Sequence, residues 1–217
     1  MLRKIIKLIF CKILFRVKYL NSNLETNIES CVVCSNHISA SDPFFLYADS
    51  DNLSIMAKAE LFKFKPFGFL LKKAGVFPIH RGEKDVKSIK HAVSILKKDE
   101  TSKLLIFPEG TRVRDGKRVP GKVGAVYIAL KAGVPILPVR IIKEKPKRTF
   151  FTKVYVIYGD PIRLDSEKSK DKDYLRRETD YMMEYIYGLK LPENLKEIKK
   201  SRPEKIKIHI DKEQIQK

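Results

Sequence analysis

The sequence predicts an α/β protein with a mostly parallel, mixed sheet and flanking helices, preceded by an amphipathic N-terminal helix. Short apolar segments alternate along the chain with segments of helical periodicity, and two of the helical segments end at a glycine. Such alternation is typical of parallel strands joined by crossover helices. With 217 residues, 43% of them hydrophobic, the chain is long enough for one sizeable core.

The elements follow in order from local patterns. A helix is expected from Asp42-Pro43, with the aspartate as its cap and the proline at its first position. Pro78 places its strand at a sheet edge, because proline cannot donate to a central ladder. The expected strands are residues 30–36, 53–58, 76–81, 134–142 and 153–162, and residues 103–110 are expected to form a strand followed by a loop. The other expected helices are residues 67–75, 84–99, 123–133 and 164–189.

The first 24 residues are expected to form a basic amphipathic helix that lies in the plane of a membrane surface. Their longest uninterrupted apolar stretch, LIFC, is too short for a membrane span or a signal peptide. The alternative is an ordinary surface helix packed on the core. The apolar stripe comprises Leu2, Ile6, Ile9, Ile13, Val17 and Leu20, and the basic side comprises Arg3, Lys4, Lys7 and Lys18. Residues 25–190 then form the main domain, and residues 191–217 form a basic charged tail.

The formal net charge of +19 predicts an anionic partner: nucleic acid, an anionic lipid surface or a phosphorylated substrate. No helix-turn-helix, zinc-finger or RNA-recognition pattern occurs, and the basic N-terminus is too apolar for a groove-binding helix. Nucleic acid is therefore disfavoured as a partner. A module that binds anionic lipid or nucleic acid without catalysis remains the alternative of another class.

The three cysteines are too few for a disulfide framework, although Cys31 and Cys34 form a C-x-x-C pattern. The pair could be redox-active or half of a zinc site. We favour a buried strand, because two valines separate the cysteines and no second pair follows. Positions three apart on a strand point to opposite faces. The pattern indicates a reducing, cytoplasmic setting.

The loop 35–44, SNHISASDPF, carries the candidate catalytic pair. His37 follows a strand, and the four residues that separate it from Asp42 are few enough for the two side chains to meet. A carboxylate on one imidazole nitrogen fixes the tautomer and raises the basicity of the other nitrogen, which makes a general base for a hydroxyl. Ser39 and Ser41 suit a turn better than a nucleophile elbow. A structural histidine with a capping aspartate, or a hydrolase that activates water, remains possible.

Two more loops place cations at strand ends. Arg81 ends the segment GVFPIHRG, and the segment FPEGTR places Arg112 after an apolar strand. Gly110 permits close backbone approach, and a guanidinium offers a forked pair of donors to phosphate.

Four blocks of this chain together resemble the glycerolipid acyltransferases, a family typified by 1-acyl-sn-glycerol-3-phosphate acyltransferase. Their order and separations agree with the family pattern over residues 31–140, and the resemblance extends to residue 162. The matching blocks are N-H-x-x-x-x-D-P at 36–43, G-x-x-x-x-x-R at 75–81, F-P-E-G-T-R at 107–112 and V-P-I-x-P-V at 134–139.

The resemblance implies acyl transfer to the sn-2 hydroxyl of lysophosphatidic acid, which gives phosphatidic acid. The donor would be a thioester of coenzyme A or of acyl carrier protein, and no cofactor or metal is implied. The acceptor could instead be glycerol 3-phosphate or another lysolipid. His37 would be the base and Asp42 its orienter. The phosphate-binding residues would be Lys58, Arg81, Glu109, Gly110, Thr111 and Arg112. A peripheral position on anionic lipid, at the cytoplasmic face of the cell membrane, would follow.

The stretch FKFKPFGFLL at 62–71 holds four of the twelve phenylalanines. It could line an acyl-chain tunnel or dip into lipid. A core helix with its lysines outside is the alternative.

Overall fold

A seven-stranded sheet organises the computed structural model, which describes residues 2–79, 86–113, 117–145 and 150–192. The strand order is β1-β7-β6-β2-β5-β3-β4, and every neighbouring pair is parallel except β6 and β7. The predicted mostly parallel, mixed sheet is therefore confirmed. The strands are β1 (Phe15–Leu20), β2 (Cys31–Ser35), β3 (Leu53–Lys58), β4 (Val76–Ile79), β5 (Lys103–Ile106), β6 (Ile136–Lys143) and β7 (Thr152–Tyr158).

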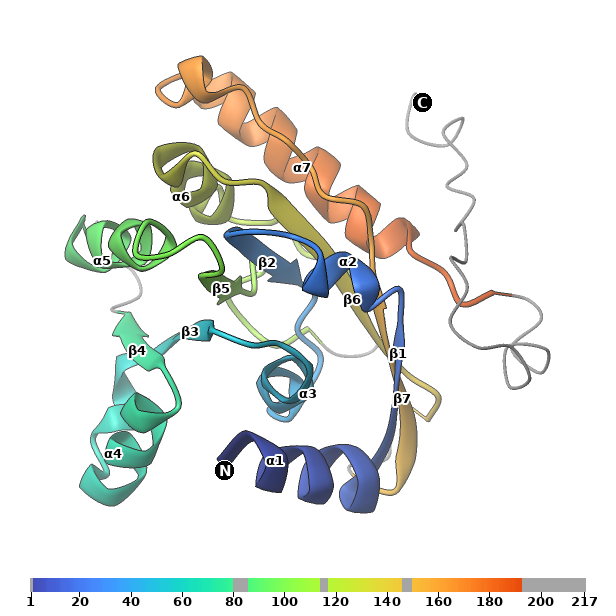
Figure 1. Cartoon of the computed structure of the whole chain (residues 1–217). Coiled ribbons are helices and arrows are strands. Elements are labelled where there is room, and N and C mark those ends of the chain that lie inside the picture. Colours follow the sequence, from blue (N-terminus) through green and yellow to red (C-terminus); the bar gives the residue numbers. More distant parts are fainter. Residues whose placement is uncertain (1, 80–85, 114–116, 146–149, 193–217) are drawn as a thin grey trace.

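Helices cover both faces of this sheet, with α5, α6 and α7 on one face and α3 and the N-terminal helix on the other (Figure 1). The N-terminal helix is α1 together with η1, which follows it directly. The α-helices are α1 (Leu2–Ile6), α2 (Asn23–Thr26), α3 (Asp42–Asp49), α4 (Lys65–Lys73), α5 (Val86–Leu96), α6 (Gly124–Ala132) and α7 (Lys172–Gly188). The remaining helical segments are η1 (Lys7–Leu14), η2 (Ala59–Phe62) and η3 (Ser166–Lys168).

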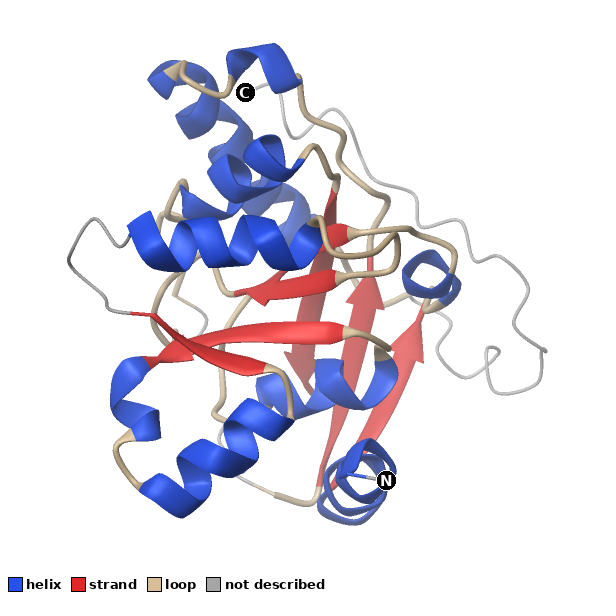
Figure 2. Ribbon diagram, turned by 60° about the vertical axis from the view of Figure 1, so that its left-hand side comes forward, coloured by secondary structure: helices blue, strands red, loops and turns tan. Residues whose placement is uncertain are grey.

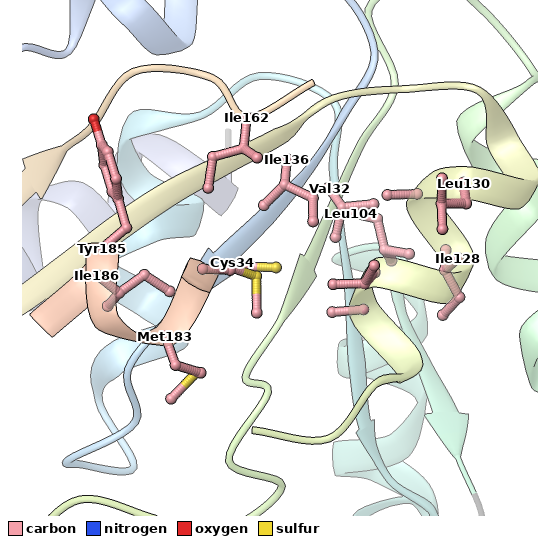
Figure 3. Packing of buried hydrophobic residues seen from close by; sticks show 14 of the residues in the cluster. Val32, Cys34, Leu104, Ile128, Leu130, Ile136, Ile162, Met183, Tyr185 and Ile186 are labelled. Carbon is pink, nitrogen blue, oxygen red and sulfur yellow. The ribbon is translucent and has the colours of Figure 1, made fainter. Parts of the chain in front are cut away.

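The sheet separates the core into two layers, and the side chains of β2 point into both of them. Val32 and Cys34 point to the layer under α5, α6 and α7, where Figure 3 shows them beside Leu104 and Ile136. Cys31 belongs to the layer under α3 and the N-terminal helix. The C-x-x-C pattern is thus a buried strand with its thiols on opposite faces, as predicted. Burial raises the pKa of the Cys31 thiol to about 12, and the described residues contain no cluster of potential metal ligands.

The N-terminal prediction is wrong beyond Leu14. Residues Phe15–Leu20 form strand β1, which pairs in parallel with β7 at one edge of the sheet. The reason lies in the local pattern, since Arg16 and Lys18 alternate with apolar neighbours at a period of two, which suits a strand with one buried face. Among the helices of the described residues, none has the length and apolar character needed to cross a bilayer.

Two further expectations need correction. The helix expected over 164–189 is divided into η3 and α7, because Asp171 caps α7 by accepting hydrogen bonds from the Asp173 and Tyr174 amides at 2.9 and 3.0 Å. The strand expected over 76–81 is described to Ile79, and it lies at the sheet edge as Pro78 indicated. The predicted charged tail lies outside the described residues, apart from residues 191 and 192.

Candidate active site

The two motif-bearing loops leave neighbouring strands at the same edge of the sheet. In the parallel pairing of β2 with β5, Cys34 lies opposite Ile106, so His37 and Phe107 follow adjacent strand ends. The rings of His37 and Phe107 stack, with centroids 4.1 Å apart and planes at 20°. The carboxyl edge of a parallel sheet is where α/β folds commonly bind ligands.

His37 and Asp42 form the predicted pair. The His37 Nδ1 atom lies 3.0 Å from Asp42 Oδ2, and the same oxygen accepts hydrogen bonds from the Ile38 and Ser39 amides at 2.7 Å each. A carboxylate in this position holds a proton on Nδ1 and leaves the Nε2 lone pair available. The Asp42 side chain is buried, whereas 15% of the His37 side chain is exposed. An imidazole held in this way can act chemically as a general base.

Asp42 does not cap α3, contrary to the sequence prediction. The capping position belongs to Ser41, whose side chain makes no capping hydrogen bond, and Pro43 follows Asp42 in the first turn. The Asp42 carboxylate instead points back into the loop that precedes the helix. Its hydrogen bonds order residues 37–39, so this side chain shapes the catalytic loop as well as orienting the imidazole.

Asn36 fixes the start of the same loop. Its side-chain amide donates to the Ile141 carbonyl at 3.0 Å, and its side-chain oxygen accepts from the Ile141 amide at 2.7 Å. The side chain continues the backbone ladder between β2 and β6 beyond the last residue of β2. The motif match included Asn36, but the sequence did not reveal this structural role.

Glu109 binds the catalytic loop rather than facing outward. Its Oε2 atom accepts a hydrogen bond from the His37 amide at 2.9 Å, and its Oε1 atom accepts one from the Tyr187 hydroxyl. In return, the Val113 amide donates to the His37 carbonyl at 2.7 Å. Burial raises the pKa of the Glu109 carboxyl, although the hydrogen bond from Tyr187 lowers it in part. The 107–113 loop thus bonds to both main-chain groups of His37, with the Glu109 side chain at its amide and the Val113 amide at its carbonyl.

Comparison with known proteins agrees with this geometry. A family model described as Acyltransferase matches residues 16–142, which is more than half of the chain. The chain belongs to the acyltransferase family. This acyltransferase is 30% identical to the 1-acyl-sn-glycerol-3-phosphate acyltransferase of Streptococcus pneumoniae, over 79% of this chain and 65% of that protein. It is 34% identical to the protein of the same name in Bacillus subtilis, over 62% and 67% of the two chains.

A solved structure is similar as well. The crystal structure of the 1-acyl-sn-glycerophosphate acyltransferase from Thermotoga maritima matches with a TM-score of 0.60 and 25% identity, over 87% of this chain and 74% of that one. Some relatives are much longer than the matched part. The aligned region is 33% identical to a chloroplast protein of Brassica napus but spans only 35% of it, and the region shared with the Streptococcus protein is just under two thirds of that protein.

Three further residues of the F-P-E-G-T-R motif follow Glu109 on the same loop. Gly110 has a φ of +67°, which favours glycine, and a Cβ atom at this position would lie 2.8 Å from Lys122 Cε. Lys122 therefore lies over the loop, and its amide donates to the Pro108 carbonyl at 2.8 Å. Thr111 and Arg112 are exposed on the same loop. Lys122 was not predicted from the sequence, because a lone lysine in a glycine-rich loop carries no pattern.

The other two predicted phosphate ligands have different outcomes. Lys58 ends β3, the neighbour of β5, and forms an ion pair with Glu60 at 2.9 Å in which both side chains are about half exposed. Its role toward phosphate stays a prediction. Arg81 lies outside the described residues.

Tyr187, at the end of α7, was also missed by the sequence analysis. The Arg118 guanidinium lies over its ring at 4.8 Å and that of Arg140 at 5.8 Å. Arg140 also donates to the Leu189 carbonyl at 2.9 Å, and burial lowers the pKa of its guanidinium. These contacts hold the last turn of α7 against β6 and Arg118, and the hydrogen bond from Tyr187 to Glu109 joins it to the 107–113 loop. Nothing in the sequence of α7 distinguishes this tyrosine from the other three in the helix.

Proposed function

We propose that this chain transfers a fatty acyl group from a thioester of coenzyme A or acyl carrier protein to the sn-2 hydroxyl of lysophosphatidic acid, forming phosphatidic acid. The observation that carries the proposal is the buried Asp42 carboxylate, bonded to His37 Nδ1 beside a loop of exposed polar and cationic side chains. Membership of the acyltransferase family and the names of the relatives point to the same reaction.

The chemistry needs one base and an acceptor hydroxyl. As the hydroxyl oxygen attacks the thioester carbonyl, His37 Nε2 takes its proton, and Asp42 stabilises the imidazolium that forms. The tetrahedral intermediate then collapses, the carbon–sulfur bond breaks, and the imidazolium returns the proton to the departing thiolate. Within the described residues, Asp42 supplies the one side-chain hydrogen bond to the His37 ring, and no serine or cysteine is engaged there. The substrate hydroxyl is therefore the nucleophile.

Recognition of the acceptor requires positive charge at the same edge. Arg112 and Thr111 extend from the loop next to His37, and Lys58 ends a strand on that edge. We infer that these side chains, together with Arg81 of the matched motif, hold the glycerol phosphate. The Glu109 side chain is excluded from this role, because both of its oxygens accept hydrogen bonds inside the protein and its charge would repel phosphate.

A lysolipid acceptor resides in a membrane, so we propose peripheral attachment at the cytoplasmic face. Four apolar side chains on the N-terminal helix are exposed. Phe64, which immediately precedes α4, and Phe69, which lies within α4, are exposed as well. Both helices lie at the lower end of the molecule in Figures 1 and 2. The exposed set on the N-terminal helix is Ile5, Leu8, Ile9 and Ile13.

The predicted apolar stripe is divided between two environments. Ile6 is half-buried and packs on the core with Phe10, whose ring stacks on Phe44 of α3 at 4.3 Å. Ile9 and Ile13 are exposed. The N-terminal helix therefore both packs on the protein and presents an apolar face, and only that face is available to lipid.

The proposed function is tested by offering the purified protein a panel of acceptors and both thioester donors in detergent, with products identified by mass spectrometry. Phosphatidic acid made from lysophosphatidic acid, and lost in a His37→Ala variant, is the expected result. Thioester hydrolysis without acceptor dependence would identify a hydrolase. A product formed only from glycerol 3-phosphate or from another lysolipid would reassign the acceptor.

A further inference from the structure

Phe151 combines a rare backbone conformation with an exposed aromatic ring. Its φ is +55°, and 62% of the residue is exposed. The other non-glycine residues with positive φ in the described part of the chain are Asn21 and Asn52, a residue type that tolerates this conformation. A bulky aromatic side chain does not tolerate it easily, so surrounding contacts must hold Phe151 in this conformation.

The structure holds Phe151 in place through the N-terminal helix. The Phe151 amide donates to the Leu14 carbonyl at 2.7 Å, and the rings of Phe150 and Phe15 lie 5.8 Å apart. Leu14 is the last residue of η1. The start of β7 is thereby fixed to the end of the amphipathic helix, and the two phenylalanines stay exposed beside it.

This position continues the exposed apolar face of the helix. Ile13 immediately precedes Leu14 and is 58% exposed, and Phe150 and Phe151 are exposed at the strand start that is bonded to Leu14. Cations surround the junction. Lys153 pairs with Glu144 at 3.0 Å, and Lys145 and Arg16 also lie close enough to lower the pKa of the Glu144 carboxyl after the larger effect of Lys153.

We propose that Phe150 and Phe151 form a second lipid-inserting element, which enters an anionic bilayer together with the exposed face of the N-terminal helix. The apolar rings match the acyl region, and three cations against one carboxylate match anionic head groups. This proposal rests on the proposed membrane attachment. It adds a contact contributed by the sheet itself, at the edge that carries His37.

The element also links the bilayer to the catalytic pair. Lys143, the last residue of β6, has its ammonium 5.5 Å from the centre of the Phe15 ring. Burial lowers the pKa of this ammonium, and the Asp42 carboxylate partly opposes that shift, so the two charges lie near each other.

A Phe151→Trp variant of the full chain tests insertion directly, because the protein contains no tryptophan. With vesicles of equal parts phosphatidylcholine and phosphatidylglycerol, its emission should shift to the blue, and brominated acyl chains should quench it. Val86→Trp is the matched control, since Val86 is an exposed residue of α5, which covers the other face of the sheet. Unshifted, unquenched emission from Trp at position 151 of the vesicle-bound protein would overturn the proposal.

A Phe151→Asn variant separates insertion from folding. Asparagine tolerates positive φ, so the melting temperature should stay the same or rise, while affinity for the same vesicles should fall about tenfold or more. Unchanged affinity would contradict the proposal. A change of oligomeric state without lipid would also contradict it, since it would make the element a contact between copies of this chain.

Activity on short-chain, dissolved lysolipid separates this inference from the proposed function. That activity should be unchanged in Phe151→Asn, because Phe151 lies outside the catalytic loops. If the unaltered chain acylates no acceptor while the tryptophan reporter is still quenched, the proposed reaction fails and lipid insertion stands.

Discussion

The Tyr187 hydroxyl donates a hydrogen bond to the Glu109 carboxylate, whose other oxygen accepts from the His37 amide. The last turn of α7 thus stabilises the backbone of the catalytic histidine from outside every matched motif. Tyr187 is a positioning residue in this arrangement, because it acts through Glu109.

Replacing Tyr187 by phenylalanine should lower kcat several-fold and move the acidic limb of its pH profile to higher pH. The hydrogen bond from Tyr187 lowers the pKa of Glu109, so its loss lets burial raise that pKa further. Glu109 then stays protonated to higher pH and supports the His37 loop less well. Tyr185→Phe is the control, since the Tyr185 hydroxyl accepts from the Asp160 amide at 3.1 Å instead. Equal pH profiles for the two variants would argue against the positioning role.

Stability should change with pH in a related way. Because the folded-state pKa of Glu109 is raised, the protonated carboxyl favours folding, and stability declines as pH rises from the ordinary pKa of 4.5 to the folded value. In Tyr187→Phe this declining window should extend to higher pH, as measured by thermal melts across the acid range.

His37→Ala should lose about 10²–10⁴-fold in turnover, the usual value of general acid–base catalysis, while lysolipid binding survives. Asp42→Asn should also be severely impaired. Its remaining side-chain oxygen can accept the Ile38 and Ser39 amides, but it carries no charge to stabilise an imidazolium. Steady-state kinetics and a binding titration check both expectations. Near-normal turnover in a folded His37→Ala protein would sink the mechanism.

Arg112→Lys should raise KM for the lysolipid much more than KM for the thioester. Lysine keeps the charge of the exposed Arg112 side chain but cannot make forked hydrogen bonds to phosphate. Lys117→Arg, a change at another exposed cation of the same connection, is a suitable control. Equal effects on the two substrates would remove Arg112 from the phosphate site.

Replacing both Ile9 and Ile13 by glutamine should release the protein from anionic vesicles and leave activity on dissolved lysolipid intact. Both side chains are exposed, so the change removes apolar contact with lipid without opening a cavity in the core. High salt should weaken vesicle binding of the unaltered chain only in part, because apolar burial is not screened. Co-sedimentation at two salt concentrations measures this. Truncation through residue 20 is unsuitable, since it would remove β1.

A buried ion pair joins helix α2 to the first residue of β5. Lys103 Nζ and Glu25 Oε1 lie 2.5 Å apart, and Ser50 also donates to that oxygen at 2.5 Å. Lys103→Met alone should cost about 3–5 kcal/mol of unfolding free energy, because it leaves a carboxylate buried without its cation. The double variant Glu25→Gln, Lys103→Met should cost less. Urea unfolding provides the measurement, and equal losses would show that the pair is not coupled.

The local patterns were sufficient for β2 to β7, for α3 to α6 and for the meeting of His37 with Asp42, because these depend on short segments. They failed at β1, where apolar spacing suits either a helix or a strand until the pairing with β7 is known. They also missed Tyr187 and the role of Asn36. Each acts on a backbone group or side chain that is remote in the sequence, and no local pattern reports such contacts.

The pairing of β1 with β7 has a consequence for synthesis on the ribosome. Among the described strands, β1 is the first to be made and pairs only with β7, the last, so β1 has no partner until the other strands have been translated. The apolar, basic N-terminal segment is available for all of that time. We therefore expect the nascent chain to reach lipid first and to complete its sheet there, with the bilayer shielding the segment from aggregation until β7 arrives.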